Sequence, residues 1–177
     1  MDVLEAIFTR RSIRQYQPTP VPDELLDKIL AAGMAAPSAG NQQPWQFVII
    51  CKRDLLDKIP SISPYTEMVR QVSTAILVCG DLRLERFKGY WMQDCCAAVE
   101  NILLAAHGLG LGAVWTAVYP EDSRIDGFRE LVGLPEHVIP LALVPIGYPN
   151  TPSASVNRFN RTRIHYDGWK TLRGQNE

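Results

Sequence analysis

The segment FTRRSIRQY, residues 8–16, concentrates side chains that bind anions. Arg10, Arg11 and Arg14 lie within five positions of one another, with Ser12 between them, in a chain whose formal net charge is only −1. No acidic residue stands three or four positions before any of these arginines, so helical spacing offers them no ion pair. Guanidinium groups and a hydroxyl are the donors that a phosphate monoester needs. The residues leave two interpretations open: a phosphate site, or cations that stabilise the C-terminal end of a short preceding helix.

A second polar segment, PSAGNQQPW at 37–45, is rich in residues that form turns. Ser38, Ala39 and Gly40 are small enough to let the backbone approach a flat ligand. The amides of Asn41 and Gln43 can donate and accept hydrogen bonds, as the edge of a heterocycle requires. Taken alone, however, the segment is better explained as a connecting loop.

The alternating glycines of GLGLG, residues 108–112, look at first like a nucleotide-binding loop. A dinucleotide fingerprint needs a strand before the glycines and a helix after them, whereas the order here is reversed. The run therefore predicts a helix cap and a tight connection.

Three more arginines, Arg158, Arg161 and Arg163, lie near the C-terminus in RFNRTR. They fit a solvated tail or a nucleic-acid patch, but the chain has no basic excess, so we expect no nucleic-acid partner. The histidines and cysteines show no metal-ligand spacing, so we expect no bound metal.

Apolar periodicity and turn residues predict an α+β fold, with one central sheet and flanking helices, formed by a single domain over residues 1–177. The expected helices are 2–9, 23–36, 53–59, 91–107 and 121–134, and the expected strands are 46–51, 73–81, 113–119 and 138–149. The first two strands are predicted to be buried on both faces. Helix 91–107 is apolar almost all round, which predicts burial in a core or across a subunit interface. Pro140 and Pro145 suggest an edge position, a bulge or a strand end for the last strand.

The remaining features concern the compartment. Cys51, Cys79, Cys95 and Cys96 form no C-x-x-C pair and are predicted to be buried, reduced thiols. The N-terminus has no basic region followed by an apolar one, and no apolar run reaches the ~20 residues that span a bilayer. We therefore expect a cytoplasmic protein without a membrane partner.

Five segments in order resemble the nitroreductase family of flavoproteins: RRSIRQY, APSAGNQQPWQF, YWMQDCCAAVENILLAAHGLGLGAVW, IGYP and RFN. The resemblance extends over nearly the whole chain. It implies a nitroreductase-like fold with a mostly antiparallel sheet, and a homodimer that holds FMN at the subunit interface. It also implies that a C-terminal arm, about residues 151–177, wraps the other subunit, and that helix 91–107 is the dimer helix.

The resemblance assigns roles to three groups of residues. Those that would hold the FMN phosphate and ribityl chain are Arg10, Ser12, Arg14 and Arg158, with Arg11 contributing largely through its backbone. Those that would reach FMN from the partner subunit are Pro37, Ser38, Ala39, Asn41 and Gln43. Those that would line the flavin ring are Trp115, Thr116, Pro145 and Gly147.

The implied function is an FMN-dependent NAD(P)H oxidoreductase with a ping-pong scheme. NADH or NADPH would reduce the flavin at N5 and leave, and a nitroaromatic, a quinone or another small acceptor would take its place. The flavin carries this chemistry, so we expect no catalytic side chain. Two alternatives stay open: a non-catalytic FMN carrier or flavin-linked sensor, and a phosphate-ligand or RNA-binding module that uses the arginines alone.

Overall fold

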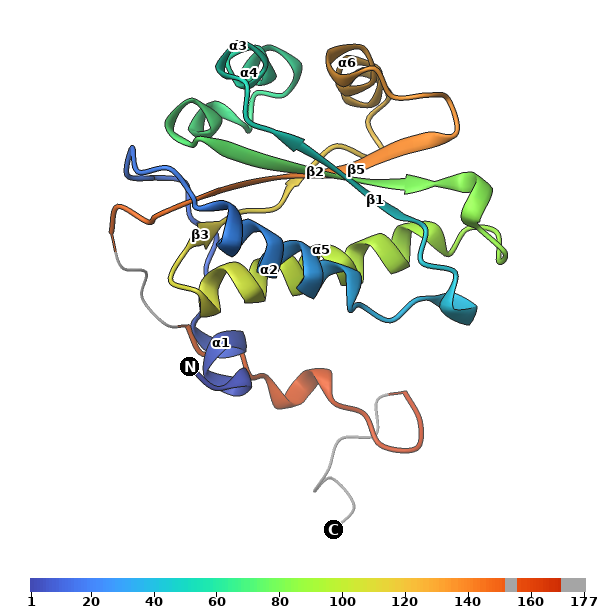
Figure 1. Ribbon diagram of the computed structural model, residues 1–177. Helices are drawn as coiled ribbons and strands as arrows, with labels where there is room; N and C mark the ends of the chain where they lie inside the picture. Colours follow the sequence, from blue (N-terminus) through green and yellow to red (C-terminus); the bar gives the residue numbers. More distant parts are fainter. Residues whose placement is uncertain (152–155, 170–177) are drawn as a thin grey trace.

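A central sheet carries helices on both faces in the computed structural model, which describes residues 1–151 and 156–169 (Figure 1). The strands are β1 (Trp45–Ile50), β2 (Thr74–Asp81), β3 (Gly112–Ala113), β4 (Thr116–Ala117) and β5 (Val138–Gly147). Their order is β1-β2-β5-β3, with β4 also paired to β5, and every pair is antiparallel. The predicted α+β fold with a mostly antiparallel sheet is therefore confirmed.

Two layers of helices cover the sheet (Figure 1). One face carries α2 (Asp23–Met34) and α5 (Trp91–Gly108), and the other carries α3 (Arg53–Leu56), α4 (Ile59–Ile62) and α6 (Asp122–Val132). Short 3-10 turns lie at Ala39–Asn41 (η1), Glu67–Gln71 (η2), Leu82–Leu84 (η3) and Arg161–Arg163 (η4).

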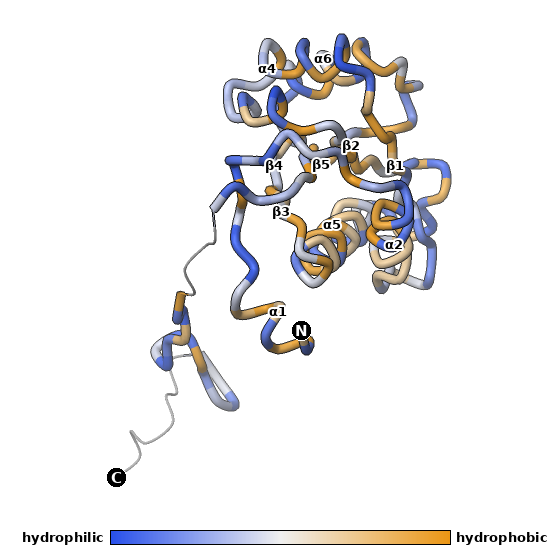
Figure 2. Tube along the Cα trace, turned by 60° about the vertical axis from the view of Figure 1, so that its left-hand side comes forward, coloured by the Kyte–Doolittle hydropathy of each residue, from blue (hydrophilic) through white to orange (hydrophobic). Residues whose placement is uncertain are grey.

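Helix α1 (Val3–Thr9) stands apart from these layers, together with the described part of the C-terminal segment (Figures 1 and 2). It buries none of its residues, and its apolar side chains Val3 and Phe8 are 74% and 64% exposed. Residues 152–155 and 170–177 of the predicted arm lie outside the described part of the chain.

Strand β2 divides the core between the two faces of the sheet. Ile76 and Val78 pack in the cluster with α2 and α5, whereas Leu77 and Cys79 pack in the cluster under α3, α4 and α6, because side chains alternate along a strand. All eight residues of β2 are buried, as predicted. The same prediction is wrong for β1, where Gln46 is exposed, because β1 is an edge strand with an uncovered side.

The prolines of β5 do not place it at an edge, since β5 lies between β2 and the short strands β3 and β4. A bulge interrupts the pairing between Val78 and Cys79, opposite Pro140. Pro145 lies opposite the gap between β3 and β4, where a missing N–H leaves no ladder bond unmade. Of the three expectations, the edge position is wrong and the bulge is found.

Two predicted elements are each split in two. The expected strand 113–119 forms β3 and β4, with Val114 and Trp115 between them. The expected helix 53–59 ends at Leu56, and a new turn begins at Ile59. Pro60 explains this break, because its ring would clash with the carbonyl of Leu56 in a continuous helix.

All four cysteines are free thiols. Cys79 and Cys95 are buried, and burial raises the pKa of Cys79 to about 12, which makes it inert. The prediction is wrong for Cys51, which is exposed just beyond the end of β1, and Cys96 is only partly buried. Within the described residues, no helix has both the length and the apolar character needed to cross a membrane.

Candidate functional site

A cleft of about 570 Å³ opens beside β4 at the edge of the sheet. Its lining comes from four separate segments of the chain and includes two guanidinium groups and two aromatic rings. The residues are Arg14, Pro64, Tyr65, Glu67, Met68, Trp115, Thr116, Ala117 and Arg124. We call it the Trp115 cleft.

The N-terminal segment carries Arg14 into this cleft because it runs against β3. Ser12 forms a bridge with Ala113, and the N–H of Ile13 donates to the Ala113 carbonyl at 3.0 Å. This approach requires glycine at position 112, since a Cβ there would lie 2.8 Å from three side-chain atoms of Ile13. The contact with Gly112 and Ala113 therefore fixes the position of the backbone from which the Arg14 side chain extends.

Tyr16 anchors the other side of Arg14. Its side chain is buried, and its hydroxyl donates to the Ile13 carbonyl at 2.6 Å, while its N–H donates to Oε1 of Gln71 at 3.0 Å. Burial raises the pKa of the Tyr16 hydroxyl, and the nearby charge of Arg14 opposes that shift only in part. Tyr16 therefore stays a neutral donor that holds the segment in place.

The charges in the cleft are unevenly paired. Arg14 is exposed and makes no hydrogen bond or ion pair with any described residue. The guanidinium of Arg124 donates to the Ala117 carbonyl at 3.1 Å and lies 5.3 Å from the centre of the Tyr65 ring. The carboxylate of Glu67 is already paired with Arg70 at 3.1 Å. The Trp115 cleft thus presents two guanidinium groups without a carboxylate of their own among the described residues.

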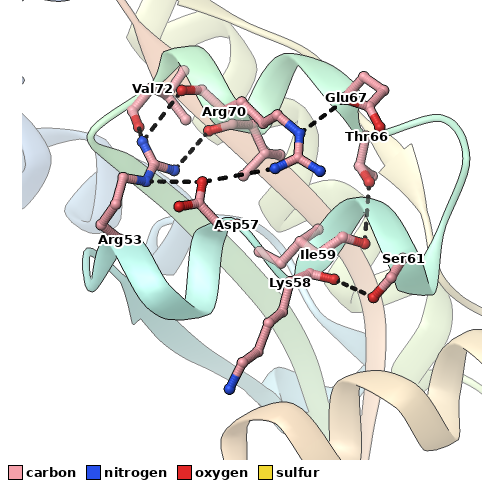
Figure 3. A network of polar contacts seen from close by, with 10 residues as sticks. Arg53, Asp57, Lys58, Ile59, Ser61, Thr66, Glu67, Arg70 and Val72 are labelled. Atoms are coloured by element: carbon pink, nitrogen blue, oxygen red, sulfur yellow. Dashed lines mark hydrogen bonds and ion pairs between the residues drawn. The ribbon is translucent and has the colours of Figure 1, made fainter.

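A polar network holds the wall that carries Tyr65 and Met68 (Figure 3). The guanidinium of Arg53 reaches from α3 and donates, at 3.1 to 3.3 Å, to the backbone carbonyls of Val69, Arg70 and Val72. The carboxylate of Asp57 forms ion pairs with Arg53, at 3.2 Å, and with Arg70, at 4.0 Å. One side chain thereby satisfies three carbonyls in and just after the 3-10 turn η2, which stabilises the shape of this wall.

The other arginines gather in a second cavity, of about 650 Å³, which we call the α1 groove. It lies between the end of α1 and the C-terminal segment and is lined by Ile7, Phe8, Arg10, Arg11, Val156, Asn157, Arg158 and Phe159. The structure therefore brings Arg158 to Arg10 and Arg11, which are 148 and 147 positions away in the chain, and leaves Arg14 in the Trp115 cleft.

Two polar contacts tie α1 to α5. Nε of Arg10 lies 3.6 Å from the carboxylate of Glu100. The hydroxyl of Thr9 donates to the Glu5 carbonyl at 2.6 Å, so it accepts from Nε2 of His107 at 2.7 Å. Burial lowers the pKa of His107, and the nearby arginines lower it further, which favours the neutral ring.

Arg11 lies differently from its neighbours. Its guanidinium turns back onto the end of α1, where it donates to the carbonyls of Phe8, at 2.8 Å, and Arg10. This position fits a residue that acts largely through its backbone.

The loop that contains Pro37, Ser38, Ala39, Asn41 and Gln43 is anchored at the opposite end of α5. Asp94 is buried, and its two oxygens accept from the N–H of Ala39 at 2.9 Å and from Nε2 of Gln42 at 2.6 Å. Oε1 of Gln42 accepts in turn from the N–H groups of residues 86 and 87, at 2.8 and 3.1 Å. One carboxylate and one amide therefore fix the whole loop.

The loop backbone is unusual. Gly40, Asn41 and Gln43 all have positive φ, at 51°, 56° and 48°. The side chains stabilise this path, because Nε2 of Gln43 donates to Oδ1 of Asn41 at 2.9 Å and the N–H of Gln43 donates to Oγ of Ser38 at 3.1 Å. Left-handed residues held in this way cluster at functional sites.

One chain does not bring the three predicted groups together. The loop is anchored at Asp94 and α1 is bonded to His107, thirteen residues further along α5. At the helical rise of ~1.5 Å per residue these two anchors are about 20 Å apart. Trp115 and Thr116 line the cleft, although the Thr116 hydroxyl is engaged with the Leu143 carbonyl at 2.7 Å. Pro145 and Gly147 are buried in β5 and do not line it.

Sequence reasoning missed most of the cleft lining, including Tyr65, Met68 and Arg124. No motif marks them, since they come from an irregular turn and from an ordinary amphipathic helix. It also missed the Asp94–Gln42 pair, whose members are 52 positions apart. Its place in the narrow polar stripe of a mostly apolar helix was the only available signal for Asp94.

Comparison with known proteins gives a consistent result. Residues 7–66 and 65–148 match the model of the nitroreductase family. A protein of Methanothermobacter thermautotrophicus named "Putative NADH dehydrogenase/NAD(P)H nitroreductase" is 53% identical over 169 residues, which cover 96% of this chain and 88% of that protein. A crystal structure from Parabacteroides distasonis with the same name has a TM-score of 0.91 at 44% identity, covering 94% and 98% of the two chains.

A third similar protein was crystallised with a ligand. The structure from Desulfovibrio desulfuricans described as "a putative nitroreductase in complex with fmn" has a TM-score of 0.81 at 33% identity, and the match covers 96% of this chain and 98% of that one. The family match covers most of the chain, and the fold agrees with both solved structures. This chain belongs to the nitroreductase family.

Proposed function

We propose that this protein is an FMN-dependent NAD(P)H oxidoreductase that acts on small acceptors such as quinones and nitroaromatic compounds. One observation carries the proposal: Arg14 lies without an ionic partner in the described chain, in a cleft that also exposes Trp115. A guanidinium beside an aromatic surface is an arrangement that suits an anionic, planar cofactor. The FMN complex of the Desulfovibrio desulfuricans relative supports this assignment.

The α1 groove fits a phosphate group. Arg10, Arg11 and Arg158 line it. The contact between Arg10 and Glu100, at 3.6 Å, is much longer than the ~2.7–2.9 Å of a strong charge-assisted hydrogen bond, so a phosphate can compete for this guanidinium. In the chain, Ser12 stands between Arg11 of the groove and Arg14 of the cleft, and we propose that its hydroxyl binds the same ligand.

The proposed site needs two subunits. The loop with Pro37, Ser38, Ala39, Asn41 and Gln43 is anchored about 20 Å along α5 from α1, so we propose that the partner subunit supplies it. Exposed apolar residues support such a homodimer: Val3 and Phe8 of α1 and Trp169 of the C-terminal segment are 74%, 64% and 80% exposed. Surfaces of this kind are typical of protein–protein interfaces.

Bound FMN would supply hydride transfer from NADH or NADPH to the acceptor. The role of the chain itself would be to bind and orient FMN, the donor and the acceptor. Arg14 would place a positive charge in the cleft, and Trp115 would supply an aromatic wall. Two polar groups of the cleft are already engaged, since Glu67 is paired with Arg70 and the Thr116 hydroxyl is bonded to the Leu143 carbonyl. A single cleft that serves donor and acceptor in turn favours ping-pong kinetics.

The test begins with the protein purified without added cofactor. We expect a yellow protein that releases about one FMN per subunit, that NADH or NADPH bleaches under anaerobic conditions, and that an added quinone reoxidises. Double-reciprocal plots at several acceptor concentrations should give parallel lines. A protein that takes up no FMN would overturn the proposal. FMN that neither nicotinamide reduces would favour the carrier or sensor alternative.

A further inference from the structure

The mouth of the Trp115 cleft carries a second cation that the proposed cofactor does not require. Arg124 lies in the first turn of α6, lines the cleft and is partly exposed. It donates one hydrogen bond to the Ala117 carbonyl at 3.1 Å. A guanidinium has five N–H donors, so most of them remain available to a ligand in the cleft.

No carboxylate in the described chain neutralises this group. Glu67, the one acidic residue that lines the cleft, is paired with Arg70 at 3.1 Å and points its charge into the network of Figure 3. The chain as a whole is nearly neutral, with a net charge of −1. The positive charge of the cleft is therefore local, and it lies beside the aromatic rings of Tyr65 and Trp115.

Arg124 is also held in place before any ligand arrives. The Tyr65 ring lies 5.3 Å from the guanidinium carbon, and the Ala117 carbonyl belongs to β4, which pairs with β5. Tyr65 comes two residues before the 3-10 turn η2, and Arg53 binds backbone carbonyls in and just after that turn (Figure 3). A planar guanidinium that is already oriented loses little freedom when it binds a carboxylate or phosphate through two parallel bonds.

We propose that Arg124 determines substrate specificity by binding an anionic group, a carboxylate or a phosphate, on an aromatic substrate of the Trp115 cleft. The rings of Tyr65 and Trp115 contact the flat part of the substrate, and Arg124 binds its charged group. This assignment rests on the proposed function for the identity of the site. Two sources of the anion share the same chemistry: an acidic aromatic acceptor, and the phosphates of the nicotinamide donor.

The experiment compares two ligands that differ only in charge. Binding of 4-nitrobenzoate and of 4-nitrobenzamide to the oxidised holoprotein is measured by calorimetry without any reductant. We expect the wild-type protein to bind the acid about tenfold more tightly than the amide, or about 1.4 kcal/mol. Arg124→Gln should abolish this preference, and Arg124→Lys should keep part of it, because lysine retains the charge but not the planar fork.

Three further variants separate this effect from changes in net charge or folding. Lys28→Gln removes one positive charge from the exposed side of α2 and should leave the preference unchanged. Tyr65→Leu removes the ring beneath Arg124 at a position that is 67% exposed, so the protein should fold and the preference should fall. Tyr65→Phe keeps the ring and should keep the preference.

A second experiment measures how Arg124→Gln changes the binding of the two nicotinamide donors. If Arg124→Gln weakens NADPH about tenfold relative to NADH and leaves the acid-to-amide ratio unchanged, the anion is the 2′-phosphate of the donor. A variant that keeps both preferences, or that loses acid and amide equally, overturns the proposal. Because binding is measured without turnover, a protein that prefers the acid but is not reduced by either nicotinamide would contradict the proposed function and leave this inference standing.

Discussion

The polarity of the hydrogen bonds around Asp94 gives the sharpest prediction. Both carboxylate oxygens of Asp94 accept, one from the N–H of Ala39 and one from the amide NH2 of Gln42. In Asp94→Asn one of these oxygens becomes an NH2 group, which would face another donor. Gln42 cannot correct this by rotating its amide, because its oxygen already accepts from the N–H groups of Arg86 and Phe87.

The cost follows from the number of donors left without acceptors. Either orientation of the new amide strands a pair of buried donors, and each unsatisfied buried group costs about 1–3 kcal/mol. We therefore expect Asp94→Asn to lower the free energy of unfolding by about 2–3 kcal/mol, and Tm by about 4–10 °C for a chain of this size. Since Ala39 lies in the loop proposed to bind FMN, affinity for FMN should fall as well.

The free energy of unfolding is measured by urea unfolding followed by circular dichroism, and Asp94→Asn is compared with two control variants. Asp126→Asn changes an acidic residue whose side chain is 75% exposed, and it should cost less than about 0.5 kcal/mol. The double variant Asp94→Asn, Gln42→Glu exchanges donor and acceptor between the two side chains and again gives every N–H an acceptor. It should recover most of the lost stability. A double variant no more stable than Asp94→Asn alone would refute the reasoning.

Three other predictions concern the site and its support. Arg14→Gln should raise the Kd for FMN at least about tenfold in a fluorescence titration of the apoprotein, because it removes a charge-assisted bond to the ligand; unchanged affinity would remove Arg14 from the site. Gly112→Ala should cost about 1–3 kcal/mol in thermal unfolding, since its Cβ would lie 2.8 Å from neighbouring side-chain atoms, whereas Gly108→Ala, with nothing within 4 Å, should cost nothing. Hydrogen bonding from Arg83 holds the pKa of Asp81 below its ordinary value. The stability that this pair contributes is therefore fully present above the unfolded pKa of about 3.9, and it is lost as the pH falls through the lower pKa of the folded state. Urea unfolding from pH 7 to pH 3 should therefore show the advantage of the wild-type protein over Asp81→Asn disappearing in acid.

Patterns repeated over many residues were sufficient to predict the main elements. The continuous apolar run at 73–81 became β2, with every residue buried, and the apolar helix 91–107 became α5, packed against α2 and the sheet. Breaks in an element that single residues cause were harder to predict from the sequence. Pro60 ends α3 although the surrounding pattern is helical, and the gap between β3 and β4 depends on how β5 pairs on that side.

The site depends on contacts that no local spacing describes. The sequence shows that the N-terminal arginines have no acidic partner at helical spacing. In the structure, however, Arg10 forms an ion pair with Glu100, which is 90 positions away in the chain. Arg124 belongs to the cleft only because α6 returns to the sheet beside β4. Charge and residue type predicted a binding site near the N-terminus, but which groups remain unpaired could be known only from the packing of distant segments.

Helix α5 also has a consequence for how this protein can change in evolution. Its N-terminal half fixes the Pro37–Gln43 loop through Asp94, and its C-terminal half fixes α1 through Glu100 and His107. Deleting a single residue between these anchors would shorten the helix by about 1.5 Å and rotate one anchor relative to the other by about 100°. Surface loops can gain or lose residues at little cost, whereas this stretch of helix cannot. We therefore expect insertions and deletions among related sequences to avoid the interval from Asp94 to His107.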